Sequence, residues 1–152
     1  RKMREKRLPL NANTHFYGTG VDCEHFGTAL SSHLAVAPEI ARFSGPVLGY
    51  VGVIDERIDY DLLASLADAS KEWDIAMVGP VAKVNPATLP RRENLHWLGG
   101  RDYLRLPAIV KGFSIAMMPF ALNAATEYIN PTKALEYMAT GRPVVSTAPG
   151  TL

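Results

Sequence analysis

Three side chains that lie close together in the sequence could bind one ligand: the hydroxyl of Thr132, the ammonium of Lys133 and the carboxylate of Glu136. Asn130 and Pro131 precede them and are typical of a helix cap and of a first helical position, so we expect a helix to begin there. The free N–H groups and positive dipole end of a helix N-terminus favour a phosphate beside Thr132 and Lys133. Glu136 follows one turn later on the same face, where it can accept two hydroxyls of a ribose. A surface ion pair between Lys133 and Glu136 on a capped helix is the alternative, and spacing alone leaves both interpretations open.

Strand and helix patterns alternate along the rest of the chain. They predict strands at 46–53, 74–78, 95–98, 113–119 and 143–146, helices at 59–73, 103–112 and 131–140, a short strand at 15–18 and a connector at 29–45. This alternation calls for a mostly parallel sheet covered on both faces, a Rossmann-like three-layer α/β domain. Ligands bind such domains at the carboxyl ends of the strands. The loops of interest therefore follow Val53, Val78, Leu98 and Phe120.

Length and composition limit the classes of protein to which the chain can belong. Its 152 residues suffice for one domain with connecting segments. A hydrophobic share of 47% with 20% charged residues excludes disordered, collagen-like and coiled-coil proteins. No apolar run approaches the roughly 18 residues of a membrane span, and no signal-peptide pattern is present. Cys23 is the only cysteine, which excludes an internal disulfide and a cysteine-rich zinc site and predicts a reducing, cytoplasmic compartment.

Charge and motif searches exclude further functions. The first seven residues carry five basic side chains and one acidic one, which leaves the rest slightly acidic and without the broad positive face that nucleic acid requires. The stretch 18–23 approaches a dinucleotide fingerprint, but Cys23 stands where its third glycine belongs, so NAD binding is excluded there. Walker, nucleophile-elbow and His-Glu-x-x-His motifs are missing, and the four histidines lack ligand spacing. We expect neither a metal nor another cofactor.

The stretch 130–145, with its order Pro-x-Lys-x-x-Glu-Tyr-Met-Ala-x-Gly-x-Pro-Val-Val, resembles the nucleotide-sugar motif of GT-B glycosyltransferases of the group 1, family 4-like kind. Many of these are retaining enzymes of bacterial polysaccharide assembly. Three further stretches agree in order and spacing: 20–22 with Phe26, 49–52 and 94–99. The resemblance covers residues 13–148.

The resemblance implies a set of residues that bind the nucleotide sugar: Gly52, Gly79, Leu98, Asn130, Thr132, Lys133 and Glu136. In it, the glycine of the first strand lets the backbone approach the diphosphate, and Gly79 and Leu98 line the nucleobase pocket. Thr132 and Lys133 hold phosphate, and Glu136 binds ribose.

The chain departs from the family pattern at two places. The acid that often contacts the donor sugar is replaced by Tyr128, with Glu127 beside it. The usual Arg and Lys after the first glycine strand are missing, because Val53 follows the glycine, and Arg57 is the candidate to replace them. An arginine among neighbouring acids in that loop makes electrostatic sense for a diphosphate site, although a solvent-facing loop charge is an equal alternative.

The resemblance thus implies the donor-binding half of a hexosyltransferase that moves a sugar from a nucleotide diphosphate sugar to a saccharide or lipid-linked acceptor. Bacterial envelope or exopolysaccharide synthesis is the expected setting, at the inner face of the membrane. We expect residues 1–12 to be the tail of a helix from a missing amino-terminal domain, and residues 13–152 to form a domain truncated at its carboxyl end. Acceptor groups and any catalytic base would lie in the missing half, so the fragment alone should be inactive. A noncatalytic receiver or ligand-binding module and a UDP-sugar epimerase of the same fold are the alternatives.

Overall fold

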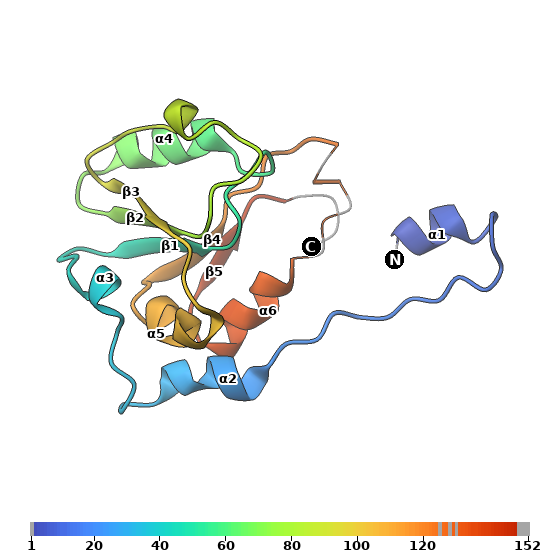
Figure 1. The fold of residues 1–152 in the computed structure, drawn as a ribbon, viewed down its shortest axis with the longest axis horizontal. Coiled ribbons are helices and arrows are strands. Elements are labelled where there is room, and N and C mark those ends of the chain that lie inside the picture. The colour runs from blue at the N-terminus through green and yellow to red at the C-terminus, as the bar shows by residue number, and fades with distance from the viewer. Residues whose placement is uncertain (1, 125, 128, 130, 149–152) are drawn as a thin grey trace.

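The computed structural model describes residues 2–124, 126–127, 129 and 131–148. Five parallel strands form one sheet in the order β3-β2-β1-β4-β5, as Figure 1 shows. The strands are β1 (Val47–Val51), β2 (Asp74–Val78), β3 (Leu95–Gly99), β4 (Ile115–Met118) and β5 (Val144–Ser146). Every pairing is parallel, so the predicted α/β sheet is confirmed. The strand β1 is central, and four of its five residues are buried, as expected for a strand covered on both faces.

Helices cover both faces of the sheet (Figure 1). Helix α4 (Tyr60–Ala69) lies on one face, and α2 (Cys23–Gly27), α3 (Pro38–Ala41), α5 (Leu106–Lys111) and α6 (Thr132–Ala139) lie on the other. The connection between α5 and β4 packs closely on the sheet, because a Cβ on Gly49 of β1 would lie 2.2 Å from the ring of Phe113. Short 3₁₀ turns lie at η1 (Thr28–Leu30), η2 (Pro86–Thr88) and η3 (Tyr103–Arg105).

Helix α4 is shorter than the predicted 59–73. It begins as expected, because the carboxylate of Asp59 accepts the backbone N–H of Leu62 at 2.9 Å and so caps it. It ends at Ala69 because Asn94, from a distant loop, donates through Nδ2 to the carbonyls of Ala67, Ser70 and Trp73 at 3.1, 2.8 and 3.1 Å. This amide takes the place of further helical hydrogen bonds.

The predicted helix 103–112 is two elements, the 3₁₀ turn η3 followed by α5. Pro107 explains the division, because it stands within the first turn of α5, where a residue without an N–H is tolerated. Helix α6 begins at Thr132 with Pro131 as its cap, one residue later than the sequence predicts. Asn130, the predicted cap, lies outside the described residues. Gly141 follows the helix at a φ of 71°, the left-handed conformation that ends many helices.

The amino-terminal segment differs most from expectation. Residues 15–18 pair with no strand in the described part of the chain, so the predicted strand there is wrong. They belong instead to an extended arm that leads away from the sheet to α1 (Lys2–Arg7), as Figure 1 shows. The predicted connector 29–45 is mostly irregular but includes the end of η1 and the four-residue helix α3.

Candidate functional site

The carboxyl ends of β1 and β2 meet through two glycines. Gly52 and Gly79 have φ angles of 151° and 155°, which side-chain-bearing residues rarely adopt. A Cβ on Gly79 would lie 1.8 Å from the carbonyl oxygen of Gly52, so the two backbones leave no room for a side chain. Gly79 also donates its N–H to the carbonyl of Gly99 at 2.9 Å. The ends of β3, β2 and β1 therefore form one continuous edge of bare backbone.

Helix α6 is attached to this edge by Tyr137. Its buried hydroxyl accepts the N–H of Val51 at 2.8 Å and donates to the carbonyl oxygen of Val51 at 3.3 Å. The ladder between β1 and β4 pairs only Leu48 and Gly49 of β1, so the tyrosine supplies partners to Val51, which lies beyond the paired residues. The polar groups of a buried strand end are thereby satisfied by a side chain of the helix.

This attachment places Lys133 above the end of β1. A Cβ on Gly52 would lie 2.9 Å from Cε and 3.0 Å from Nζ of Lys133. The ammonium also lies over two aromatic rings, 5.3 Å from the centroid of Tyr50 and 5.8 Å from that of Phe120. The lysine is half-buried, and its apolar stem packs while its charge stays at the edge of the sheet.

The pKa values of Lys133 and Glu136 both shift in the direction that disfavours charge. Burial lowers the pKa of Lys133; the negative charges of Glu136 and Asp55 oppose this shift, and the positive charge of Arg57 adds to it. Burial also raises the pKa of the Glu136 carboxyl, against the positive charges of Lys133 and His25. A polyanionic ligand would favour the charged form of the lysine. Both side chains are half-buried in the structure.

Arg57 is held by a buried acid in the loop between β1 and α4. Its Nε lies 3.0 Å from each carboxylate oxygen of Asp55, and its Nη2 lies 2.6 Å from Oδ2. Asp55 is only 3% exposed, whereas the arginine side chain is 39% exposed. The guanidinium therefore has a fixed orientation in the loop.

The sequence comparisons identify the family. Residues 45–152 match the family model described as "Glycosyl transferases group 1". The chain belongs to this family. A relative in Bacillus subtilis (strain 168), named "Putative teichuronic acid biosynthesis glycosyltransferase", is 31% identical over 106 residues. The match covers 68% of this chain and 27% of that relative, so the chain spans about a quarter of its length.

The structure of this group 1 glycosyltransferase chain brings four of the predicted site residues to one edge. Gly52, Gly79 and Lys133 meet there, with Arg57 in electrostatic reach of the lysine. Leu98 precedes Gly99 at the end of β3 and is partly buried against the core.

The remaining predicted residues lie on or near α6. Thr132 opens the helix and is exposed, and Glu136 follows one turn later. Glu127 is exposed in the loop that precedes the helix. Asn130 and Tyr128 lie outside the described residues.

Sequence reasoning missed a charged cavity beside the edge of the glycosyltransferase domain. It has a volume of about 590 Å³, and its lining residues are Glu39, Pro80, Gly100, Arg101, Asp102 and Arg105. Glu39 accepts from Arg101 Nε at 2.8 Å and from Arg105 Nη2 at 3.0 Å. The sequence indicated only the loop after Leu98 as a place of interest. It could not show that Glu39 contacts this loop, because Glu39 lies 62 residues before Arg101.

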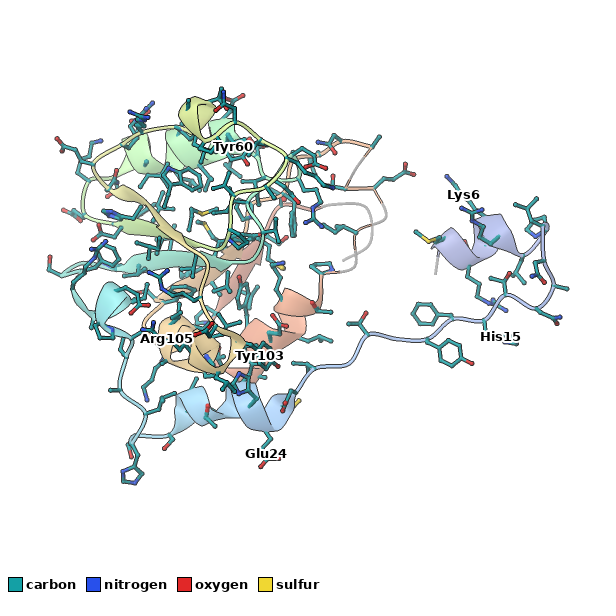
Figure 2. All side chains as sticks on the ribbon, in the orientation of Figure 1. Lys6, His15, Glu24, Tyr60, Tyr103 and Arg105 are labelled. Atoms are coloured by element: carbon teal, nitrogen blue, oxygen red, sulfur yellow. The ribbon has the colours of Figure 1, made fainter. Side chains whose placement is uncertain are left out.

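Tyr103 and Arg105 lie beside α5 at the same corner of the domain (Figure 2). The ring of His25 stacks on Tyr103 with 4.4 Å between centroids, and His25 Nε2 lies 3.0 Å from the carbonyl oxygen of Tyr103. His25 is thereby held close enough to Glu136 to act on its pKa. The spacing of the histidines in the sequence did not predict that His25 lies near Glu136.

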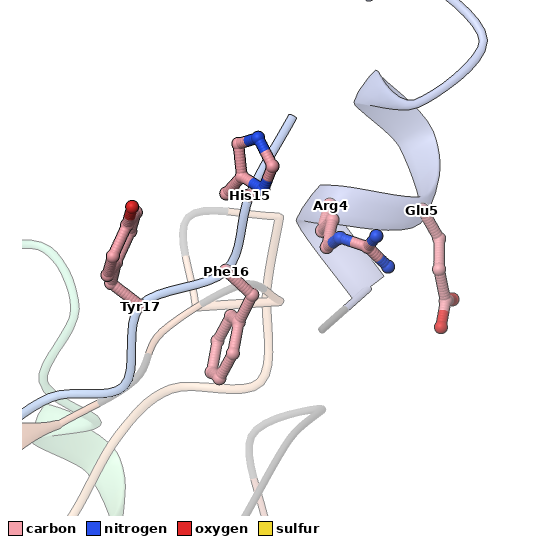
Figure 3. Close-up of a pocket in the computed structure, with 5 residues that line it drawn as sticks. All are labelled: Arg4, Glu5, His15, Phe16 and Tyr17. Carbon is pink, nitrogen blue, oxygen red and sulfur yellow. The ribbon is translucent and has the colours of Figure 1, made fainter. Parts of the chain in front are cut away.

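A second hollow lies on the arm, apart from the candidate site. It is lined by Arg4, Glu5, His15, Phe16 and Tyr17 (Figure 3). Arg4 Nε donates to the carbonyl of Thr14 at 3.2 Å and so joins α1 to the arm. Among the described residues, no three His, Cys, Asp or Glu side chains are grouped to hold a metal ion. No helix in the described part of the chain is long and apolar enough to cross a membrane.

Proposed function

We propose that this domain binds the nucleotide diphosphate sugar for an enzyme that transfers the sugar to a saccharide or lipid-linked acceptor. Membership of the group 1 glycosyltransferases supports this, and the name of the Bacillus relative favours bacterial envelope polysaccharide synthesis as the setting. The observation that carries the proposal is the position of Lys133, which lies at the start of a helix over a glycine-only backbone edge. Such an edge admits a diphosphate, and the lysine and helix N-terminus offer it positive charge.

Each candidate residue has one expected role. The diphosphate lies against Gly52, between Lys133 and the exposed edge of Arg57, with Thr132 donating a hydroxyl. Glu136 accepts the ribose hydroxyls, and the base lies toward Gly79 and Leu98. Asn130 belongs to the same nucleotide-sugar site, and Glu127 and Tyr128 are the proposed sugar contacts.

The positive groups at this site also have a catalytic consequence. The lysine and the helix N-terminus would stabilise the charge that grows on the leaving diphosphate as the sugar departs. This is the role that a divalent metal can fill elsewhere, so we expect no metal requirement.

The proposal assigns the other functions of the enzyme to residues outside the donor-binding domain. The chain spans 27% of its relative, and we expect the acceptor site and any catalytic base to belong to an amino-terminal domain, with residues 1–12 as the tail of its last helix. In this proposal residues 13–152 belong to the donor-binding domain. The isolated chain should therefore bind donor but not transfer sugar. A lipid-linked acceptor would place the whole enzyme at the inner face of the cytoplasmic membrane.

Calorimetric titration with UDP, GDP, ADP and the matching nucleosides tests the donor site. Lys133→Ala should weaken binding of the nucleoside diphosphate by about 1–3 kcal/mol and leave the bare nucleoside nearly unaffected, because the lysine acts on phosphate. Glu136→Gln should weaken both ligands, because the carboxylate acts on ribose. Lys71→Ala removes an exposed lysine after α4 and should change neither.

Two results would contradict the proposal. If the parent chain binds none of the three nucleoside diphosphates, the domain is not a donor site. If it binds one and both substitutions leave the affinity unchanged, the residues assigned to phosphate and ribose are wrong. Turnover of free UDP-N-acetylglucosamine without an acceptor would favour the epimerase alternative.

A further inference from the structure

Asp55 is a buried carboxylate to which the proposed function gives no role. Besides its contacts with the guanidinium, it accepts the backbone N–H of Arg57 at 3.1 Å through Oδ1. Its own carbonyl accepts the N–H of Ile58 at 3.1 Å and the hydroxyl of Tyr60 at 2.8 Å. The acid is thus fixed by its main chain while its side chain holds the arginine. The hydrogen bonds from Arg57 keep the pKa of Asp55 below its ordinary value although burial acts in the opposite direction.

The guanidinium of Arg57 has one edge held and one edge open. Nε and Nη2 face Asp55, whereas Nη1 makes no hydrogen bond with any described residue. The planar group cannot turn without breaking its contacts with the carboxylate. A second anion can therefore bind the open edge with little loss of side-chain freedom.

The loop that carries Arg57 is attached to the same edge of the sheet as Lys133. The carbonyl of Arg57 accepts the N–H of Ala121 at 2.8 Å, and Ile58 forms a bridge with Phe120, the residue whose ring lies under the lysine. The positive charge of Arg57 also lowers the pKa of Lys133, so the two cations act on each other. Two neighbouring cations repel unless an anion lies between or behind them.

We infer that Asp55 is a positioning residue. It holds one edge of the Arg57 guanidinium so that the open edge faces the donor diphosphate, and it does not contact the phosphates itself. The inference rests on the proposed function. The positioning role explains why an acid belongs in an anion site. At 3% exposure Asp55 is shielded from the ligand, and its charge offsets that of Arg57 when no ligand is bound. A lysine in place of Arg57 could not be held by two parallel hydrogen bonds.

A double-mutant cycle separates positioning from loop stability. We expect Asp55→Asn and Arg57→Ala each to weaken binding of the nucleoside diphosphate that the parent binds by roughly tenfold. The double variant should bind no more weakly than Arg57→Ala, because Asp55 acts only through the arginine. Affinity for the bare nucleoside should stay unchanged in all three.

The exposed pair Asp68 and Arg92 provides a matched control, since Arg92 holds Asp68 in the same two-point manner, with 2.7 Å from Nε to Oδ1 and 2.9 Å from Nη2 to Oδ2. Asp68→Asn should leave nucleotide affinity unchanged. Should Asp55→Asn fail to fold, Asp55→Glu and Arg57→Lys replace it. Both variants keep the charges but shift or lose the two-point contact. Both should bind the nucleoside diphosphate more weakly than the parent does, with affinity for the bare nucleoside unchanged.

Unchanged affinity in Asp55→Asn, or losses that add in the double variant, would overturn the positioning role. So would retention of full affinity in Asp55→Glu and Arg57→Lys. A parent chain that binds none of UDP, GDP and ADP would overturn the proposed function and this inference together. A parent that binds while the Asp55 variants match it overturns only the inference.

Discussion

Removing one hydroxyl from the core, by Tyr137→Phe, should destabilise the domain by about 2 kcal/mol. The hydroxyl is the only described partner of Val51 on the β4 side of β1, and the side chain is 1% exposed, so water cannot replace it. The bond from the N–H of Val51 is short, at 2.8 Å, and its loss leaves a buried donor unsatisfied at about 1–3 kcal/mol. The bond to the carbonyl is longer, at 3.3 Å, and adds less.

Urea unfolding measures this change. A loss of about 2 kcal/mol raises the unfolding constant about 30-fold and lowers the midpoint by about 1 M without changing the slope. Tyr17→Phe is the matched control, because Tyr17 lies on the arm with 87% of its surface exposed, and its unfolding should match that of the parent. A change below about 0.5 kcal/mol in Tyr137→Phe would refute the idea that this hydroxyl completes the end of β1.

Three further substitutions test other parts of the fold. Gly79→Ala should cost more than about 3 kcal/mol in thermal or urea unfolding, because its Cβ would overlap the carbonyl oxygen of Gly52 at 1.8 Å and its φ is 155°; a stable variant would contradict the strand-end geometry. Asn94→Ala should cost about 2 kcal/mol and speed amide exchange at the end of α4, because three carbonyls lose their donor. Glu136→Gln should stabilise the ligand-free domain at pH 7, because the folded-state pKa of Glu136 is raised and its charge is unfavourable there. The gain should shrink as the pH falls through the raised pKa and vanish below the unfolded value of 4.5, where both states are protonated; a pH-independent difference would contradict this sign.

The sequence predicted the elements well where the signal was local. Five of the six predicted strand ranges differ from the observed strands by at most two residues at either end, since each strand is an apolar run bounded by polar or turn residues. The end of α4 could not be predicted, because the amide that ends it comes from Asn94, 24 residues after Ser70. The arm was misread because a short apolar stretch resembles a strand whether or not a partner strand exists.

The candidate site was predictable to a similar degree. The resemblance placed Gly52 and Lys133 at one ligand, and the structure brings them together. Nothing in the spacing could show that Tyr137 joins them, since it reaches across 86 residues to Val51. The ion pair between Asp55 and Arg57 is local in sequence. An acid two residues before an arginine occurs in many loops, however, so the pair could not be recognised as part of a site until the burial of Asp55 was known.

The order of the strands also has a consequence for how the protein is made. The central strand β1 forms its second ladder with β4, and the contact between Val47 and Ser114 spans 67 residues. At about 5–20 residues per second, a ribosome needs about 3–13 s to synthesise that interval. During this time the central strand, four of whose five residues are buried in the folded domain, has an open edge, which is the kind of surface on which nascent chains pair with one another. The yield of folded protein should therefore depend on the speed of translation between these two strands and on chaperones that cover the edge while it waits.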